Sequence, residues 1–315
     1  MAFKEEITDW LRSLQDNICG SLEKMDGRSS FKEDLWERSA GGGGRTRIIQ
    51  DGAVIEKGGV NFSAIHGKLP EFLAKELKLN SAEERSFYAT GVSIVIHPVS
   101  PMVPIIHMNV RYFETSPISP LLKERSGHQQ ADGVRWFGGG IDLTPHYVVE
   151  EDAKYFHTSL KKTCDQHHPS YYPEFKKWAD DYFFIKHRNE TRGVGGIFFD
   201  HLKPNDQFTL QQRFAFVKSI GECFAPVYTH LVNKNKDLPY GEKEKQWQLV
   251  RRGRYVEFNL VYDRGTKFGM ETDGRIESIL MSLPKDARWL YNYIPEKNSA
   301  EEKTLVFFHK TTNWA

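Results

Sequence analysis

The sequence predicts an α+β fold, with a large, mainly antiparallel β-sheet flanked by helices on both faces. Two observations lead to this prediction. Candidate strands follow one another between residues 46 and 144 without regular crossover helices, whereas alternating strands and helices would predict a parallel sheet. Helical periodicity is concentrated at the N-terminus and after residue 150. No repeat or low-complexity linker divides the chain, which favours a single domain over residues 1–315.

The N-terminal half is expected to supply one long helix and most of the strands. Residues 3–24 place Ile7, Leu11 and Leu14 at helical spacing. Residues 46–66 read as two paired strands, because Asp51-Gly52 is a tight-turn signal between them. The other elements expected in this half are a helix over 68–78 and strands over 91–96 and 105–113.

The C-terminal half is expected to be mostly helical. Residues 115–132 are polar and marked by prolines, which predicts a surface loop. A strand interrupted by the three glycines at 138–140 follows over 134–144, and residues 197–199 read as a short buried strand. The other expected elements are helices near 150–167, 171–190, 208–234 and 275–283 and a strand over 254–262.

Composition and charge exclude several classes of partner. The net charge of the 315-residue chain is +1, so neither nucleic acid nor a membrane surface is an expected partner. An anionic ligand would need a local cluster of arginines. No apolar stretch approaches the roughly 20 residues that span a bilayer. The N-terminus lacks the features of secretory and transit peptides, and we therefore expect a cytoplasmic location.

The cysteines and the glycine run at 41–44 are weak candidates for a functional site. Cys19, Cys164 and Cys223 are far apart and form no CxxC pair, which argues against a zinc ribbon, an iron–sulfur cluster or a disulfide framework. The glycines at 41–44, followed by Arg45, resemble a phosphate-binding loop. Their spacing does not fit one, and the residues before them read as helix, so a plain turn or a loop beside a ligand is favoured.

A polar stripe on one predicted strand is the first candidate site. His107, Asn109 and Arg111 share one face of the strand over 105–113. The flanking residues 103–106 are too apolar for an exposed edge, so this face is expected to line a ligand site. An arginine there suits a carboxylate, which it can hold through two hydrogen bonds.

A glycine-rich strand is the second candidate site. The glycines at 138–140 would let a ligand or another backbone approach closely, and Asp142 follows beside that opening. A β-bulge with an aspartate that caps a helix is the alternative. Farther along the chain, Arg264, Lys267 and Arg275 form a cationic group that could equally be a solvated surface cluster.

The run over residues 176–200 combines aromatics, cations, carboxylates and glycines. It reads as a helix, with Arg188 and Arg192 near its end, followed by a turn and a strand. Together with other segments it resembles the oxygen-dependent coproporphyrinogen III oxidases, and the resemblance extends over essentially the whole chain. The other segments that carry the resemblance are 39–44, 59–61, 107–114, 136–145, 252–259 and 263–269.

The resemblance implies a homodimer that converts two propionates of coproporphyrinogen III to vinyl groups. Molecular oxygen would be the oxidant, and protoporphyrinogen IX, carbon dioxide and hydrogen peroxide the products. It implies neither an organic cofactor nor a resident metal. Residues 255–274 correspond to a stretch associated with dimerisation. A metal-dependent oxidase and a tetrapyrrole carrier without catalytic activity are the alternatives.

The resemblance also implies roles for particular residues. His107 corresponds to a proposed proton donor, Asp142 to an aspartate that binds pyrrole N–H groups, and Arg111 to a catalytic and substrate-binding arginine. The other implied substrate contacts are Ser93, Asn109, Val110, Asp273, Gly274 and Arg275. If a metal were bound, as manganese is described in some bacterial relatives, its ligands would be His97, His107, His157 and His187.

Three departures from the family pattern stand out. The loop over 115–132 is longer than usual, Arg135 replaces a common aromatic residue, and Ala179 replaces a common cysteine. A thiol at position 179 is therefore not needed. We expect Arg188, Arg192 and Asp200 to brace the helix–strand junction behind the site, and Arg111 and Arg275 to hold propionates.

Overall fold

The computed structural model describes residues 3–77, 85–117, 133–271 and 275–315. Its centre is a seven-stranded sheet in the order β1-β2-β3-β4-β5-β6-β9, in which each neighbouring pair is antiparallel. This confirms the predicted fold class. The strands are β1 (Lys32–Glu37), β2 (Gly42–Gln50), β3 (Ile55–Lys68), β4 (Ser86–Pro98), β5 (Ile105–Thr115), β6 (Arg135–Thr144) and β9 (Gly195–Leu202).

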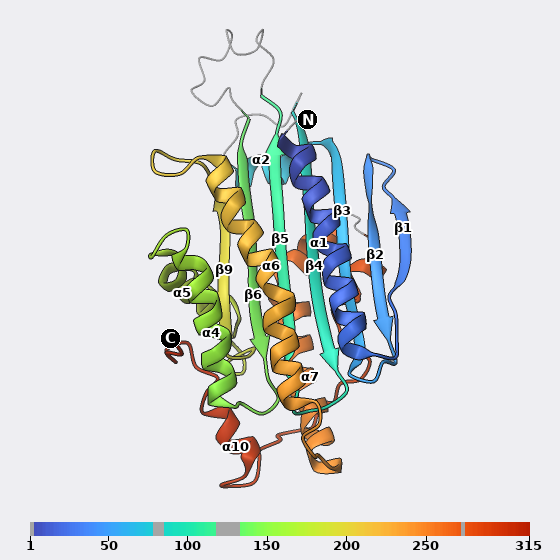
Figure 1. The fold of residues 1–315 in the computed structure, drawn as a ribbon, viewed down its shortest axis with the longest axis vertical. Coiled ribbons are helices and arrows are strands. Elements are labelled where there is room, and N and C mark those ends of the chain that lie inside the picture. Colours follow the sequence, from blue (N-terminus) through green and yellow to red (C-terminus); the bar gives the residue numbers. More distant parts are fainter. Residues whose placement is uncertain (1–2, 78–84, 118–132, 272–274) are drawn as a thin grey trace.

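Three helices cover one face of the sheet: α1 (Phe3–Asp26), α4 (Glu150–Asp165) and α6 (Leu210–Asn235) (Figure 1). The stripe predicted on α1 is buried, including Ile7, Leu11 and Leu14. It packs in one core cluster with Met108 and Val110 of β5. This face of the sheet is therefore the hydrophobic core.

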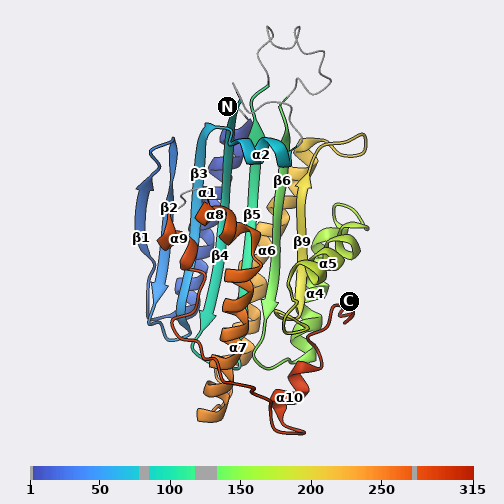
Figure 2. The same cartoon turned by 180° about the vertical axis from the view of Figure 1, so that it is seen from behind.

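The opposite face is covered by α7 (Glu242–Val261), α8 (Arg264–Glu271), α9 (Ile276–Leu280) and α2 (Glu71–Glu76) (Figure 2). Strand residues alternate between the faces, so this side receives the odd-numbered positions of β5. The helix α5 (Tyr171–Tyr182) lies beside β9, and the two-residue strands β7 (Phe184–Ile185) and β8 (Glu190–Thr191) form a separate hairpin. A short helix, α10 (Ala300–Leu305), was not predicted.

Three expectations from the sequence are wrong. The strand expected over 254–262 belongs to α7, whose aromatic residues Tyr255 and Phe258 are buried at helical spacing. The helix expected over 171–190 ends at Tyr182, and a hairpin follows it. The residues before the glycines at 41–44 form β1, so those glycines belong to the β1–β2 hairpin. Most of the loop expected over 115–132 lies outside the described residues.

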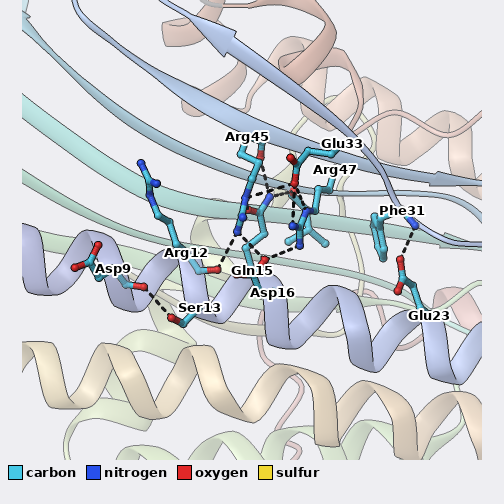
Figure 3. Close-up of polar contacts among 11 residues, drawn as sticks. Asp9, Arg12, Ser13, Gln15, Asp16, Glu23, Phe31, Glu33, Arg45 and Arg47 are labelled. Carbon is cyan, nitrogen blue, oxygen red and sulfur yellow. Dashed lines mark hydrogen bonds and ion pairs between the residues drawn. The ribbon is translucent and has the colours of Figure 1, made fainter.

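An ion-pair network fastens the edge strands to α1 (Figure 3). Arg45 and Arg47 of β2 lie 2.8 and 2.7 Å from Asp16 of α1, and Arg47 also lies 2.9 Å from Glu33 of β1. Arg45 donates to the side chain of Gln15, which in turn donates to the backbone of β2 and β3. Single exposed pairs contribute little, but this network joins three elements at the free edge of the sheet.

Candidate active site

The face of the sheet opposite the hydrophobic core carries a row of polar residues across three strands. The pairing register places Asn61 of β3 opposite Ser93 of β4, and Ser93 opposite Asn109 of β5. On the next rows, His107 faces Asp142 and Arg111 faces Gly138 of β6. The structure thus brings Ser93, His107, Asn109, Arg111 and Asp142 onto one surface, although they come from three strands.

His107, Asp142 and Arg192 form a connected group at one end of this surface. The His107 Nδ1 lies 2.8 Å from Asp142 Oδ1. One Arg192 nitrogen, Nη2, donates to both Asp142 oxygens at 2.8 Å. Asp142 and Arg192 are each 2 % exposed, whereas the His107 side chain is 21 % exposed. The imidazole is therefore the most exposed member of the group.

The group keeps a carboxylate ionised in a buried place. Burial alone would raise the pKa of Asp142, but the positive charge of Arg192 and the hydrogen bonds from His107 and Arg192 outweigh it and lower that pKa. The same attraction raises the pKa of Arg192 against the opposing effect of burial. A fixed charge pair in a low-dielectric setting interacts strongly with charge that develops in a bound ligand.

The sequence pattern alone does not identify Arg192 as a site residue. It follows the β7–β8 hairpin, and its guanidinium lies over the rings of Phe183, Tyr255 and Phe258 at 4.3 to 4.7 Å. Its Nη1 donates to Asn259 of α7 at 2.8 Å. It packs on Phe183 at the end of the helix, as expected of a residue at this junction, and because it also bonds Asp142 it belongs to the group around that carboxylate. Its partners lie 50 and 67 residues away, so no local pattern could have revealed them.

Arg111 lies across Gly138 and is paired with Asp200 of β9. Its Nη2 is 2.8 Å from Asp200 Oδ2, and its Nη1 donates to Asn109 Oδ1 at 2.7 Å. A Cβ at position 138 would lie 2.7 Å from Asp200 and 2.8 Å from the Arg111 guanidinium. Gly138 thus makes room for this ion pair. The Arg111 side chain is 32 % exposed and can still reach a ligand.

Arg188, the third residue expected to brace the junction, pairs with Glu257 of α7. Ala179 is fully buried beside Phe183 and Phe258, two of the rings around Arg192. Arg135 is 58 % exposed and points toward Glu114, 3.9 Å away. Neither departure removes a member of the group around Asp142.

An apolar cluster borders Arg111 on the side of α2. Its buried members are Leu69, Ala74, Phe87, Phe113 and Trp136. The rings of Phe113 and Trp136 stack with centroids 5.2 Å apart, and the Arg111 guanidinium lies over Trp136 at 5.8 Å. The surface therefore combines cations and hydrogen-bonding groups with aromatic area, which suits a ligand that is both anionic and apolar.

The remaining implied substrate contacts are scattered. Val110 points into the hydrophobic core on the opposite face, which leaves only its backbone to a ligand. Arg275 is the N-cap residue of α9 and pairs with Asp34 of β1. Asp273 and Gly274 lie outside the described residues.

The four histidines that would be ligands if a metal were bound do not form one cluster. His97 bonds the backbone oxygen of Ser282, and His157 uses both ring nitrogens on Tyr172 and Val194. His187 uses both of its nitrogens on Tyr262 and Glu257. Within the described ranges, no group of three or more His, Cys, Asp or Glu residues is placed to hold a metal. The set does not fit a single manganese ion.

A cavity of about 240 Å³ lies apart from this surface, lined in part by Asp26, Ser100, Lys236 and Tyr240. Asp26 accepts five backbone N–H bonds there, from residues 28, 29, 53, 54 and 55. Its carboxylate is thus saturated by the chain itself. It holds the turn between β2 and β3 against the end of α1.

The α+β fold and the polar and aromatic surface around Asp142 suit an enzyme that acts on an anionic ligand. A model of the family described as coproporphyrinogen III oxidase matches residues 6–314. The chloroplastic oxygen-dependent coproporphyrinogen-III oxidase of Glycine max is 50 % identical over 299 residues, which cover 94 % of this chain and 75 % of the relative. The oxygen-dependent coproporphyrinogen-III oxidase of Drosophila melanogaster is 49 % identical over 311 residues, which cover 96 % and 76 %.

A third relative, the chloroplastic coproporphyrinogen-III oxidase 1 of Arabidopsis thaliana, is 49 % identical over 299 residues, covering 94 % of this chain and 75 % of the relative. The chain therefore belongs to the oxygen-dependent coproporphyrinogen III oxidase family, a family of haem biosynthesis. The resemblance found in the sequence motifs is confirmed. In the described part of the chain, no helix has the length and apolar character needed to cross a membrane.

Proposed function

We propose that this chain converts two propionate side chains of coproporphyrinogen III to vinyl groups, with molecular oxygen as the oxidant. For each propionate, the carboxyl carbon leaves as carbon dioxide and two hydrogens pass to oxygen, which becomes hydrogen peroxide. The product is protoporphyrinogen IX. The observation that carries the proposal beyond family membership is the buried Asp142–Arg192 pair, with His107 at its exposed side.

In this proposal the ionised Asp142 stabilises positive charge on the reacting pyrrole as a hydride equivalent leaves for oxygen. Its Oδ2 accepts one hydrogen bond from Arg192, so a lone pair remains for a pyrrole N–H. His107 transfers a proton through its Nε2, because its Nδ1 is bonded to Asp142. Arg192 keeps the carboxylate ionised and fixed in position.

Arg111 and Arg275 hold different propionates in this proposal. Arg111 belongs to β5, whereas Arg275 reaches β1 through Asp34, and four strand spacings of about 4.8 Å separate these strands. Two cations so far apart suit a ligand with carboxylates around its circumference. Ser93, Asn109 and the backbone of Val110 would contact the macrocycle between them. Asp273 and Gly274 are proposed as contacts from the sequence alone.

We also propose a homodimer made of single-domain chains in the cytoplasm. Several large apolar side chains are exposed on α7 to α9, within or next to the stretch 255–274. They are Leu260, Val261, Met270 and Ile276. A second copy of the chain would cover them, because exposed apolar area favours association. Light scattering that gives the mass of one chain at micromolar concentration would exclude this dimer.

The reaction is tested with purified protein and coproporphyrinogen III, with and without oxygen. We expect protoporphyrinogen, carbon dioxide and hydrogen peroxide only when oxygen is present, with two molecules of each gas consumed or released per product. Absence of product, or equal product without oxygen, would contradict the proposal. Bound substrate without turnover would indicate a carrier instead of an enzyme.

A further inference from the structure

The hairpin β7–β8, which leads into Arg192, needs support from outside. Each of its strands has only two residues, and so short a ribbon is not stable by itself in water. Arg192 must nevertheless lie within hydrogen-bond distance of Asp142. Its backbone N–H bonds the carbonyl oxygen of Phe183, which closes the hairpin at its base. Further contacts must fix the hairpin relative to the sheet.

Glu257 of α7 supplies such contacts. Its carboxylate accepts from His187 Nε2 at 2.6 Å and from Arg188 Nε and Nη2 at 2.8 Å. It also accepts from Arg254 and from the indole of Trp289, both at 3.0 Å. The Glu257 side chain is only 11 % exposed. One carboxylate thus joins the hairpin, α7 and the segment that carries Trp289.

The two residues after Glu257 contact Arg192 directly. The ring of Phe258 lies 4.7 Å from the Arg192 guanidinium, and Asn259 accepts its Nη1 at 2.8 Å. A single turn of α7 therefore holds the hairpin at Arg188 and holds Arg192 four residues later. This gives the hairpin two fixed points on one rigid helix.

We propose that Glu257 is a positioning residue for Arg192. Its carboxylate bonds the hairpin and not Asp142, and it fixes the hairpin so that Arg192 Nη2 reaches both Asp142 oxygens. Without the carboxylate, Arg188 and His187 lose their shared partner and the hairpin moves relative to α7. The role of Glu257 in turnover rests on the proposed function, whereas its effect on the Arg192–Asp142 distance does not.

The test compares E257Q with E56Q. Glu56 is a suitable control because its carboxylate is 19 % exposed and pairs with Arg252, another arginine of α7. We expect E257Q to lower kcat by about tenfold to a hundredfold with KM changed less than about threefold. E56Q should lose at least as much thermal stability and keep its kcat. E257D, which retains the charge, should recover part of the loss.

A double-mutant cycle with R192K decides whether Glu257 acts through Arg192. If it does, E257Q lowers the kcat of R192K by less than about twofold. A loss of kcat in the double variant that equals the product of the two single losses would overturn the inference. Crystal structures of E257Q and E56Q supply a readout without turnover. Loss of the Arg192–Asp142 contact in E257Q alone supports the inference, and an unchanged contact overturns it. An inactive wild-type protein would contradict the proposed function and leave this structural comparison valid.

Discussion

Arg192 donates from one nitrogen to both carboxylate oxygens of Asp142, at 2.8 Å each, with both side chains 2 % exposed. A charge pair this deeply buried is costly to form, because both ions leave water. Such a pair stabilises the fold little by itself, which agrees with the catalytic role that we propose for it beside His107. The charge pair is preorganised, so it needs no rearrangement when charge develops in the substrate.

Substitution of Gly138 should weaken substrate binding. The new Cβ in G138A would lie 2.7 Å from Asp200 and 2.8 Å from Arg111, so the ion pair must move. We expect KM for coproporphyrinogen III to rise by about tenfold with a smaller change in kcat, since Arg111 is proposed to hold a propionate. G20A is the control, because a Cβ at Gly20 meets no atom within 4 Å. Equal KM values for G138A and wild type would argue against a propionate at Arg111.

Buried histidines should make the protein less stable as the pH falls. Burial lowers the pKa of His157 to about 3, against about 6.5 in the unfolded chain. The unfolded state therefore binds the proton first, so stability is full above about pH 6.5 and falls as the pH drops toward 3. In H157Q the free energy of unfolding should depend less steeply on pH between 6 and 4, by about 1.4 kcal/mol per pH unit. The free energy of unfolding is measured by urea titration at each pH. An equal dependence on pH for H157Q and wild type would contradict this prediction.

Removal of metal ions should leave turnover unchanged. His97, His157 and His187 each bond separate groups of the protein, and His107 bonds Asp142. They are therefore not placed to share one ion. Protein dialysed against a strong chelator, with its metal content measured, should turn over at the rate of untreated protein. Loss of activity that manganese restores would favour the metal-dependent alternative.

Periodicity predicted much of the fold because it reports directly on burial. The stripe of α1 and the alternation of β5 are both consequences of one buried face, and both are present in the structure. The strand expectation for residues 254–262, the last turns of α7, is wrong because Tyr255, Val256 and Phe258 are residue types that favour strands, yet tertiary packing holds them in a helix. Local propensity is a weak guide where burial is this extensive.

The site was only partly predictable for a different reason. His107, Asn109 and Arg111 share a strand, so alternation alone placed them on one face. Arg192 and Asp200 are brought to Asp142 and Arg111 by β-pairing and by the β7–β8 hairpin, across 50 and 89 residues of sequence. Such contacts depend on the whole sheet. The sequence shows the charged residues of the run 176–200, but it does not show which residues they pair with.

The turnover of D142N with oxygen present tests the proposed role of Asp142 most directly. Asparagine keeps the shape of the side chain and removes its charge. We expect kcat to fall by at least about a hundredfold, since the charge that stabilises the pyrrole is lost. D142N also leaves Arg192 buried without a counterion, which should cost about 3–5 kcal/mol of stability. The double variant D142N/R192Q removes that unpaired charge and should recover stability without recovering turnover. A kcat within twofold of wild type in folded D142N would contradict the central role of Asp142.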